Sequence, residues 1–259
     1  MESSCRTVIN ESVFWNNFNN SPDQIPGINQ ELMPGVNWGC FSKLYTPAYW
    51  KIQYLLHNQY DEYRIKYRLG ENILEEVVAC LLGGFGLKSE TGLAAFYRLR
   101  KKQQIRVGVE YNSIKTSLSE PFLIGEKSIH YRFHNQKSKY ITNFLNRKDL
   151  DKIPLNNDLA LRSWLMTIDG IGPKTASWIT RNFLDSENVA IIDIHIFRAG
   201  LLSGLFSHKL DIQKDYFKIE QIFIQFCRAL KVQPSKMDAL MWLQMKESNR
   251  TALKAISNL

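Results

Sequence analysis

The sequence lacks the features that mark several large classes of protein. No apolar run approaches the roughly 18–20 residues needed to cross a bilayer, and residues 1–12 hold no apolar stretch of the kind a signal peptide needs. The four cysteines (Cys5, Cys40, Cys80 and Cys227) are at least 35 positions apart. No pair has the spacing of a zinc site, and no short cluster could hold an iron–sulfur cube. We therefore expect a soluble, intracellular protein with reduced thiols.

The chain also has little acidic charge and no repeat or low-complexity linker. With 33 Lys+Arg against 25 Asp+Glu, its 259 residues carry +8 at pH 7, and 44% of them are hydrophobic, enough for a sizeable core. Residues 98–152 hold thirteen basic and five acidic side chains, and this difference of eight equals the net positive charge of the whole chain. Such concentration favours a polyanionic partner, although a solvated surface that only aids solubility would give the same count.

Helical periodicity dominates the pattern of apolar residues. Residues 1–37 are rich in Asn, Ser, Pro and Gly, which is typical of irregular structure. Only residues 105–118 show the alternation of a strand. The pattern therefore predicts an all-α protein. The expected helices cover about 47–67, 73–82, 89–104, 131–145, 157–168, 173–184, a stretch that begins at 193, 215–230 and 234–247.

The segment 161–183 contains the most informative motif. A helix that ends at Gly170-Ile171-Gly172 and restarts at Pro173 predicts a two-helix hairpin with a tight turn. The amides at the start of the second helix, with the positive end of its dipole, suit an anion such as a DNA phosphate. Glycine occurs in many helical hairpins, so the turn alone is weak evidence. The evidence is strengthened by two further residues, Lys174 in the first turn of the second helix and Asp193 nineteen residues later.

The run G-I-G-P-K-T-A-S followed by I-D-I-H resembles the helix-hairpin-helix DNA glycosylase superfamily. A lysine two places after the second hairpin glycine resembles its bifunctional branch, and the closest resemblance is to the archaeal-type, AGOG-like 8-oxoguanine glycosylases. The resemblance implies an all-α, two-lobed fold with the active-site cleft between the lobes. Residues 1–70 would pack with the C-terminal helices, 71–200 would form the central lobe, and 201–259 would complete the second lobe and the base pocket.

The resemblance also assigns roles to Lys174 and Asp193. The lysine amine would attack the sugar of the damaged nucleotide, expel the base and form a Schiff base. An amine is nucleophilic only when it is unprotonated, so we expect a buried Lys174 beside the helix start. Asp193 would stabilise the positive charge that develops on the sugar and orient the lysine. Helix capping is a rival role for Asp193, and the two roles are compatible.

Two pairs of residues at helical i,i+4 spacing indicate which base is excised. Trp178 follows Lys174 by one turn, and Asp238 precedes Trp242 in the same way. In the archaeal-type enzymes, an aromatic residue and a D-x-x-x-W sequence at these positions enclose the flipped base. Stacking on aromatic rings would replace the contacts that a purine loses when it leaves the duplex. Plain core packing is the competing explanation for both tryptophans.

Further residues are candidates for contacts with DNA. The hairpin residues Gly170, Ile171 and Gly172 would bind phosphate, as would Lys137 and Lys139, and His195 either contacts DNA or only orients its loop. Phe85 or Leu87, beside the Gly83-Gly84 turn, could fill the gap left by the flipped base, although an ordinary glycine-rich turn explains the same sequence. Asp169 departs from the family pattern, in which proline is common, and adds negative charge to the turn.

These features predict a base-excision-repair glycosylase with AP lyase activity, acting on duplex DNA that contains 8-oxoguanine. The alternatives are a glycosylase for another oxidised or alkylated base and a hairpin protein that binds DNA without cutting it. We expect a monomer in the cytoplasm, associated with the nucleoid, or in the nucleus, with no membrane contact. No metal ligand set and no required cofactor are predicted, although hairpin carbonyls in relatives can hold Na+ or K+.

Overall fold

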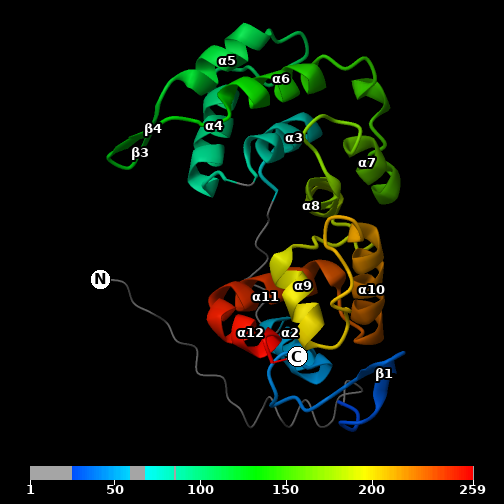
Figure 1. Cartoon of the computed structure of the whole chain (residues 1–259). Helices are drawn as coiled ribbons and strands as arrows, with labels where there is room; N and C mark the ends of the chain where they lie inside the picture. Colours follow the sequence, from blue (N-terminus) through cyan, green and yellow to red (C-terminus); the bar gives the residue numbers. More distant parts are fainter. Residues whose placement is uncertain (1–24, 59–67, 85, 259) are drawn as a thin grey trace.

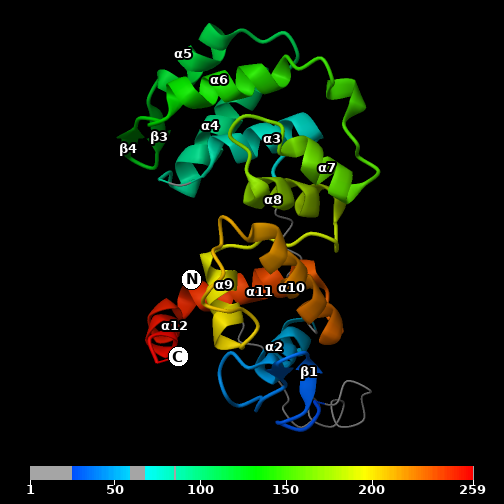
Figure 2. The ribbon, with the colours of Figure 1, turned by 45° about the vertical axis from the view of Figure 1, so that its right-hand side comes forward.

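The computed structural model describes residues 25–58, 68–84 and 86–258, and helices make up most of this part of the chain. Figures 1 and 2 show the helices in two groups, one above the other. Each group surrounds its own cluster of buried apolar side chains. This arrangement agrees with the all-α, two-lobed fold expected from the sequence.

The upper group, which we call the hairpin lobe, contains the middle of the chain. Its core includes Phe96, Leu118, Phe144, Leu161 and Ile179. The elements of this lobe are α3 (Ile73–Leu82), α4 (Ser89–Lys101), α5 (Tyr111–Ser119), β3 (Phe122–Ile124), β4 (Lys127–Ile129), α6 (His134–Leu145), the 3-10 helix η2 (Leu150–Lys152), α7 (Asp158–Leu165) and α8 (Pro173–Leu184).

The lower group, which we call the terminal lobe, combines early and late segments of the chain. Trp50 of the early helix is fully buried and donates from its ring nitrogen to the Ser203 hydroxyl at 3.1 Å. Gln233 N donates to the Tyr54 hydroxyl at 3.2 Å. The elements of this lobe are β1 (Glu31–Met33), β2 (Val36–Asn37), α2 (Pro47–Asn58), α9 (Ile194–Leu202), α10 (Tyr216–Ala229), α11 (Pro234–Glu247) and α12 (Asn249–Ile256).

The division between the lobes differs from the boundary at 200 that we expected. Ala190, Ile192 and Ile196 already belong to the core of the terminal lobe. The chain leaves the hairpin lobe after α8, because the apolar face of α9 packs on α11 and α12. Asp193 therefore stands on the terminal lobe, whereas Lys174 stands on the hairpin lobe.

The strand expected within 105–118 is wrong, because most of this stretch forms α5. Ile114, Ser117 and Leu118 are its buried residues, and their spacing of three and four is that of one helical face. The apolar–polar alternation that suggested a strand lies in the loop before the helix, in which Val109 is buried between exposed neighbours. The strands that do occur are short antiparallel pairs, β1 with β2 and β3 with β4.

Three further features bear on the expectations from composition. Within the described ranges, no helix is both long and apolar enough to cross a membrane. Cys40, Cys80 and Cys227 are free thiols, and burial raises the pKa of Cys80 and Cys227. The described residues contain no group of three or more His, Cys, Asp or Glu side chains that could hold a metal ion.

Candidate active site

The hairpin between α7 and α8 has the tight turn that its glycines predict. Gly170 has a φ of +84°, and a Cβ at this position would lie 2.5 Å from the ring of Tyr140. Only glycine meets both demands without displacing the backbone or the ring. Ile171 is buried in the hairpin-lobe core, whereas Gly170 and Gly172 are exposed. The turn is thus anchored on one side and exposed on the other.

The exposed side of the turn presents the start of helix α8. Gly172 is the N-cap with extended backbone, and Pro173 is the first helical residue. Ala176 N donates to Gly172 O at 2.9 Å, so the amides before Ala176 lie ahead of the helical ladder. Free amides at a helix start suit an anion. Asp169 accepts a hydrogen bond from the Asn143 side chain at 3.2 Å, which ties the turn to α6.

Lys174 is the second residue of α8 and its side chain is exposed. A buried lysine was expected, and the structure differs on this point. Lys174 lies on the same face of α8 as Ser177, Trp178 and Arg181, because residues three, four and seven positions apart share one side of a helix. Two of these, Ser177 and Arg181, bond to side chains of the terminal lobe. The face that carries Lys174 is therefore turned toward the segment that carries Asp193.

Asp193 is the N-cap of α9 and is 9% exposed. Its Oδ1 accepts from His195 N at 2.8 Å and from Ile196 N at 3.0 Å. Oδ2 makes no hydrogen bond within the described part of the chain. The carboxylate thus caps the helix with one oxygen and leaves the other available, so capping and a role in catalysis are compatible.

One buried carboxylate connects the two segments that carry Lys174 and Asp193. Glu220 Oε1 accepts from the Ser177 hydroxyl at 3.1 Å and from Ala190 N at 3.0 Å. Ser177 stands one turn after the lysine, and Ala190 stands three residues before the aspartate. The same oxygen atom therefore connects the hairpin helix to the stretch that ends at Asp193.

A second buried carboxylate, that of Asp238, also connects α8 to the segment before Asp193. It is paired with Arg181 of α8 and accepts from Ile191 N at 3.0 Å. Burial raises the pKa of Asp238 to about 7, and the charge of Arg181 opposes this shift. We expected Asp238 to line the base pocket. In the structure it is 3% exposed, and its two oxygens bind Arg181 and the backbone.

The aromatic residue Trp242 lies next to the residues that follow Asp193. The rings of His195 and Trp242 meet edge to face, with their centroids 6.5 Å apart. The Lys246 ammonium lies over the Trp242 ring, 4.7 Å from its centroid. His195 Nδ1 is buried and has no hydrogen-bond partner among the described residues. Trp242 is only partly buried, so packing of the core leaves some of its surface exposed.

Comparison with known proteins identifies the family. Residues 56–232 match the Ogg-HhH family model, described as 8-oxoguanine DNA glycosylase, over well more than half of the chain. The chain belongs to this family. A curated member, the 8-oxoguanine DNA glycosylase/AP lyase of Metallosphaera sedula, is 26% identical over 189 residues, which are 70% of this chain and 86% of that protein.

Solved structures of the family share the fold. The 8-oxoguanine DNA glycosylase of Thermotoga maritima matches with a TM-score of 0.56 at 23% identity, over 76% of this chain and 96% of that one. The 8-oxoguanine glycosylase/lyase of Methanocaldococcus jannaschii, in complex with a 15mer DNA that contains 8-oxoguanine, matches with a TM-score of 0.51 at 20% identity. This second match covers 78% of this chain and 89% of that one.

The family match includes some of the candidate site and ends before the rest. The hairpin, Lys174, Asp193 and Glu220 lie within residues 56–232, whereas Asp238 and Trp242 lie beyond its end. The structure connects both residues to the matched region, since Asp238 bonds to Ile191 N and the Trp242 ring contacts that of His195. The C-terminal residues thus adjoin the Asp193 segment, which belongs to the matched family region.

Trp242→Ala should impair base excision by the family chemistry while sparing cleavage at a preformed abasic site. Stacking of one base on an aromatic side chain contributes about 1–3 kcal/mol, which corresponds to a roughly 5- to 150-fold slower excision. The measurement is single-turnover excision of 8-oxoguanine and, separately, scission of an abasic duplex. Trp242→Phe keeps an aromatic face and should retain most of the activity. Unchanged excision by the Ala variant would remove Trp242 from the pocket.

Several residues expected to contact DNA lie apart from this arrangement. The Lys137 ammonium donates to the Gly83 carbonyl oxygen at 3.2 Å, and burial lowers its pKa. It therefore binds the carbonyl at the end of α3. Lys139 is exposed on α6. Phe85 lies outside the described residues, and Leu87 packs against the hairpin-lobe core.

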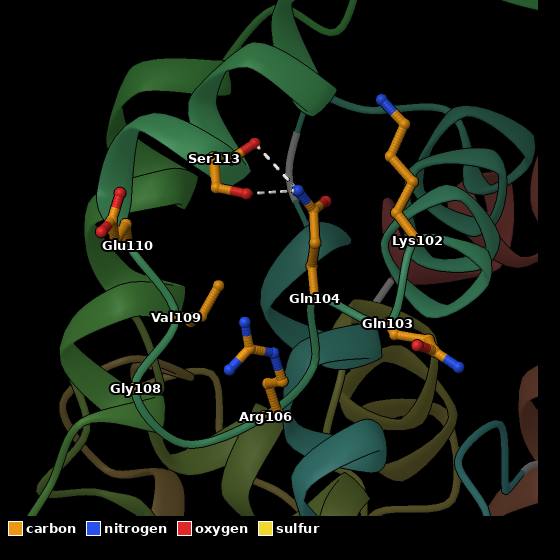
Figure 3. Close-up of a pocket in the computed structure, with 8 residues that line it drawn as sticks. All are labelled: Lys102, Gln103, Gln104, Arg106, Gly108, Val109, Glu110 and Ser113. Atoms are coloured by element: carbon orange, nitrogen blue, oxygen red, sulfur yellow. Dashed lines mark hydrogen bonds between the residues drawn. The ribbon is translucent and has the colours of Figure 1, made fainter.

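A hollow of about 360 Å³ lies elsewhere, at the turn from α4 to α5. Figure 3 shows the Arg106 side chain directed into it, below Gln104 and Val109. The Gln104 amide donates to the hydroxyl and the carbonyl of Ser113, which closes one wall. None of the residues that line this hollow belongs to the hairpin, to α8 or to the Asp193 segment.

Four polar residues of the site were not predicted from the sequence: Glu220, Arg162, Arg181 and Tyr216. A signal for Glu220 was present. It stands on the apolar stripe of α10, among Ile219, Phe223 and Ile224, where a charged side chain must be buried. A buried carboxylate needs a partner, but the spacing along the chain does not reveal which one.

Proposed function

We propose that this protein is a DNA glycosylase with AP lyase activity that removes 8-oxoguanine from duplex DNA. The observation that carries the proposal is the connection of Lys174 and Asp193 through Glu220. One buried carboxylate oxygen accepts from Ser177, one turn after Lys174 on the hairpin helix, and from Ala190, three residues before the helix-capping Asp193 on the other lobe. A protein that only binds DNA has no need of this combination.

The hairpin would bind the DNA backbone. The amides at the start of α8, exposed beyond Gly170, suit a phosphate, and the net charge of residues 98–152 favours a polyanion. Binding at this turn would place a nucleotide that has left the duplex against the face of α8 that carries Lys174. The DNA would then cover the amine, which is exposed in the protein alone.

The chemistry follows from one amine and one carboxylate. The lone pair of Lys174 Nζ attacks C1′ of the flipped nucleotide, and the bond from C1′ to the base breaks. The base leaves with the bonding electrons and takes up a proton. Ring opening and loss of a proton from Nζ give a Schiff base, which acidifies the hydrogens at C2′ so that the 3′ phosphate can be eliminated. No redox cofactor takes part in these steps.

Asp193 would act on the positive charge of the sugar. Its Oδ1 is held by two backbone amides, which fixes the direction of the carboxylate. The available Oδ2 would stabilise the oxocarbenium-like sugar and accept a proton from the lysine. Trp242, with Trp178 on the face of α8, would stack on the expelled base.

The proposal includes the setting in which the protein acts. We expect a monomer that works on double-stranded DNA inside the cell, without a membrane. A monovalent cation held by carbonyl oxygens of the hairpin, as the family resemblance suggests, would add to phosphate binding there.

A panel of lesion-bearing duplexes tests the proposed function. Duplexes with 8-oxoguanine, another oxidised base, an alkylated base or no lesion are incubated with the protein, with and without borohydride, and strand scission is measured. We expect scission and a trapped complex with the 8-oxoguanine duplex above all others. Preference for another lesion would reassign the substrate. DNA binding without scission of any duplex would show a non-catalytic hairpin protein.

A further inference from the structure

The three residues before Asp193 are held by side chains from the terminal lobe. Ala190 N donates to Glu220 Oε1 at 3.0 Å, and Ile191 N donates to Asp238 Oδ2 at 3.0 Å. Ile192 N donates to the Tyr216 hydroxyl at 3.2 Å, and this hydroxyl donates to Ala190 O at 3.0 Å. Three successive amides with three separate side-chain acceptors leave this stretch little freedom to move.

Glu220 also holds the hairpin lobe. Its Oε1 accepts from Ser177 of α8, and its Oε2 is paired with Arg162 of α7. Both helices of the hairpin are thus bonded to a residue of α10. A change in this one side chain would alter the placement of α8 relative to Asp193.

The burial of Glu220 argues against a role in stability alone. Its side chain is 0% exposed, and that of Arg162 is 12% exposed. Removing an ion pair from water costs so much that well-packed apolar residues often stabilise a protein at least as well. A buried pair defines one geometry, however, because its hydrogen bonds are directional and a shifted partner is left unsatisfied.

We propose that Glu220 is a positioning residue for catalysis, which sets the distance between Lys174 and Asp193 by binding Ser177, Ala190 and Arg162 together. Tyr216 supports it by fixing the stretch from Ala190 to Ile192. Neither residue touches the substrate. This inference rests on the proposed function, and it predicts a loss in the rate of the chemical step with little loss in DNA affinity.

Two variants with matched controls test the proposal. Glu220→Gln keeps the size of the side chain but removes its charge, and Glu76→Gln is its control. Glu76 is equally buried, and its hydrogen bonds are to the amides of Leu69 and Gly70 rather than to α8 or to the Asp193 segment. Should Glu220→Gln fail to fold, Tyr216→Phe removes only a hydroxyl.

The control for Tyr216→Phe is Tyr54→Phe. Each tyrosine is buried, at 5% and 8% exposure, and each accepts a backbone amide at 3.2 Å. The Tyr54 hydroxyl binds Gln233 N at the start of α11, so its loss leaves the Asp193 segment untouched.

The readouts are the single-turnover excision rate, the Kd for the duplex, and amide hydrogen exchange over residues 190–196. A misplacement of about 1 Å in an active site can slow a reaction by about 100-fold. We expect Glu220→Gln to slow excision by about 10- to 100-fold and Tyr216→Phe by about 3- to 10-fold, each with Kd within about threefold. Exchange over 190–196 should become faster in both variants, and both controls should match wild type.

Three results would overturn the proposal: excision as fast as wild type, a rise in Kd that accounts for the slower excision, or unchanged exchange over residues 190–196. Equal slowing in the controls would mean that any loss of stability slows the enzyme. Hydrogen exchange does not depend on activity, so it decides whether Glu220 holds this segment. Wild-type protein that excises no 8-oxoguanine would instead contradict the proposed function.

Discussion

Lys174→Gln should form no borohydride-trapped complex with an 8-oxoguanine duplex, and its excision rate should fall by about a thousandfold or more. The glutamine amide has no basic lone pair, so it can neither attack C1′ nor form a Schiff base. Lys174 is exposed at the start of α8 and is not part of the core. The variant should therefore fold normally and bind the duplex about as well as the wild type.

Lys218→Gln is the control for this loss. Lys218 is also an exposed lysine in the first turns of a helix, α10, but it stands outside the hairpin. It should trap and excise like the wild type. A Lys174→Gln protein that traps as well as wild type would place the nucleophile on another amine.

Asp193→Asn should slow excision by about 100- to 1,000-fold while Kd for the duplex changes by less than about threefold. Asparagine caps helices about as well as aspartate, so the bonds from His195 N and Ile196 N to Oδ1 can persist. What the variant loses is the negative charge that the proposed mechanism uses to stabilise the sugar. Thermal unfolding checks this separation, since the Tm should stay close to that of the wild type.

Asp193→Ala separates the two roles of this residue. It removes both the charge and the cap, so it should lose about 1 kcal/mol of stability in addition to activity. Equal losses of excision and DNA binding in the Asn variant would show that Asp193 only supports the structure. An Asn variant as unstable as the Ala variant would mean that the cap requires the charge.

Local signals in the sequence were sufficient for much of the fold. Helical periodicity predicted α3, α8 and α11 at the residues where they occur, because each buries one apolar face. Gly170, Gly172 and Pro173 predicted the hairpin turn, since only glycine suits the left-handed backbone at 170. The family resemblance then selected Lys174 and Asp193 from many lysines and aspartates.

Contacts between distant segments could not be predicted in this way. Glu220 is 43 residues from Ser177 and 30 residues from Ala190 in the chain, and its role exists only after the lobes have packed. Lys137 is a second example. Its place in a basic window suggested a phosphate contact, but the fold turns its ammonium toward the Gly83 carbonyl. Charge along a sequence does not give the direction of a side chain.

Identification of the trapped amine tests the central claim most directly. The complex with an 8-oxoguanine duplex is reduced with borohydride, digested with trypsin and nuclease, and analysed by mass spectrometry. Because a modified lysine resists trypsin, an adduct on Lys174 predicts one sugar-bearing peptide that spans residues 163–181. A sugar adduct on any other peptide, with 163–174 recovered unmodified, would contradict the assignment of Lys174 as the nucleophile.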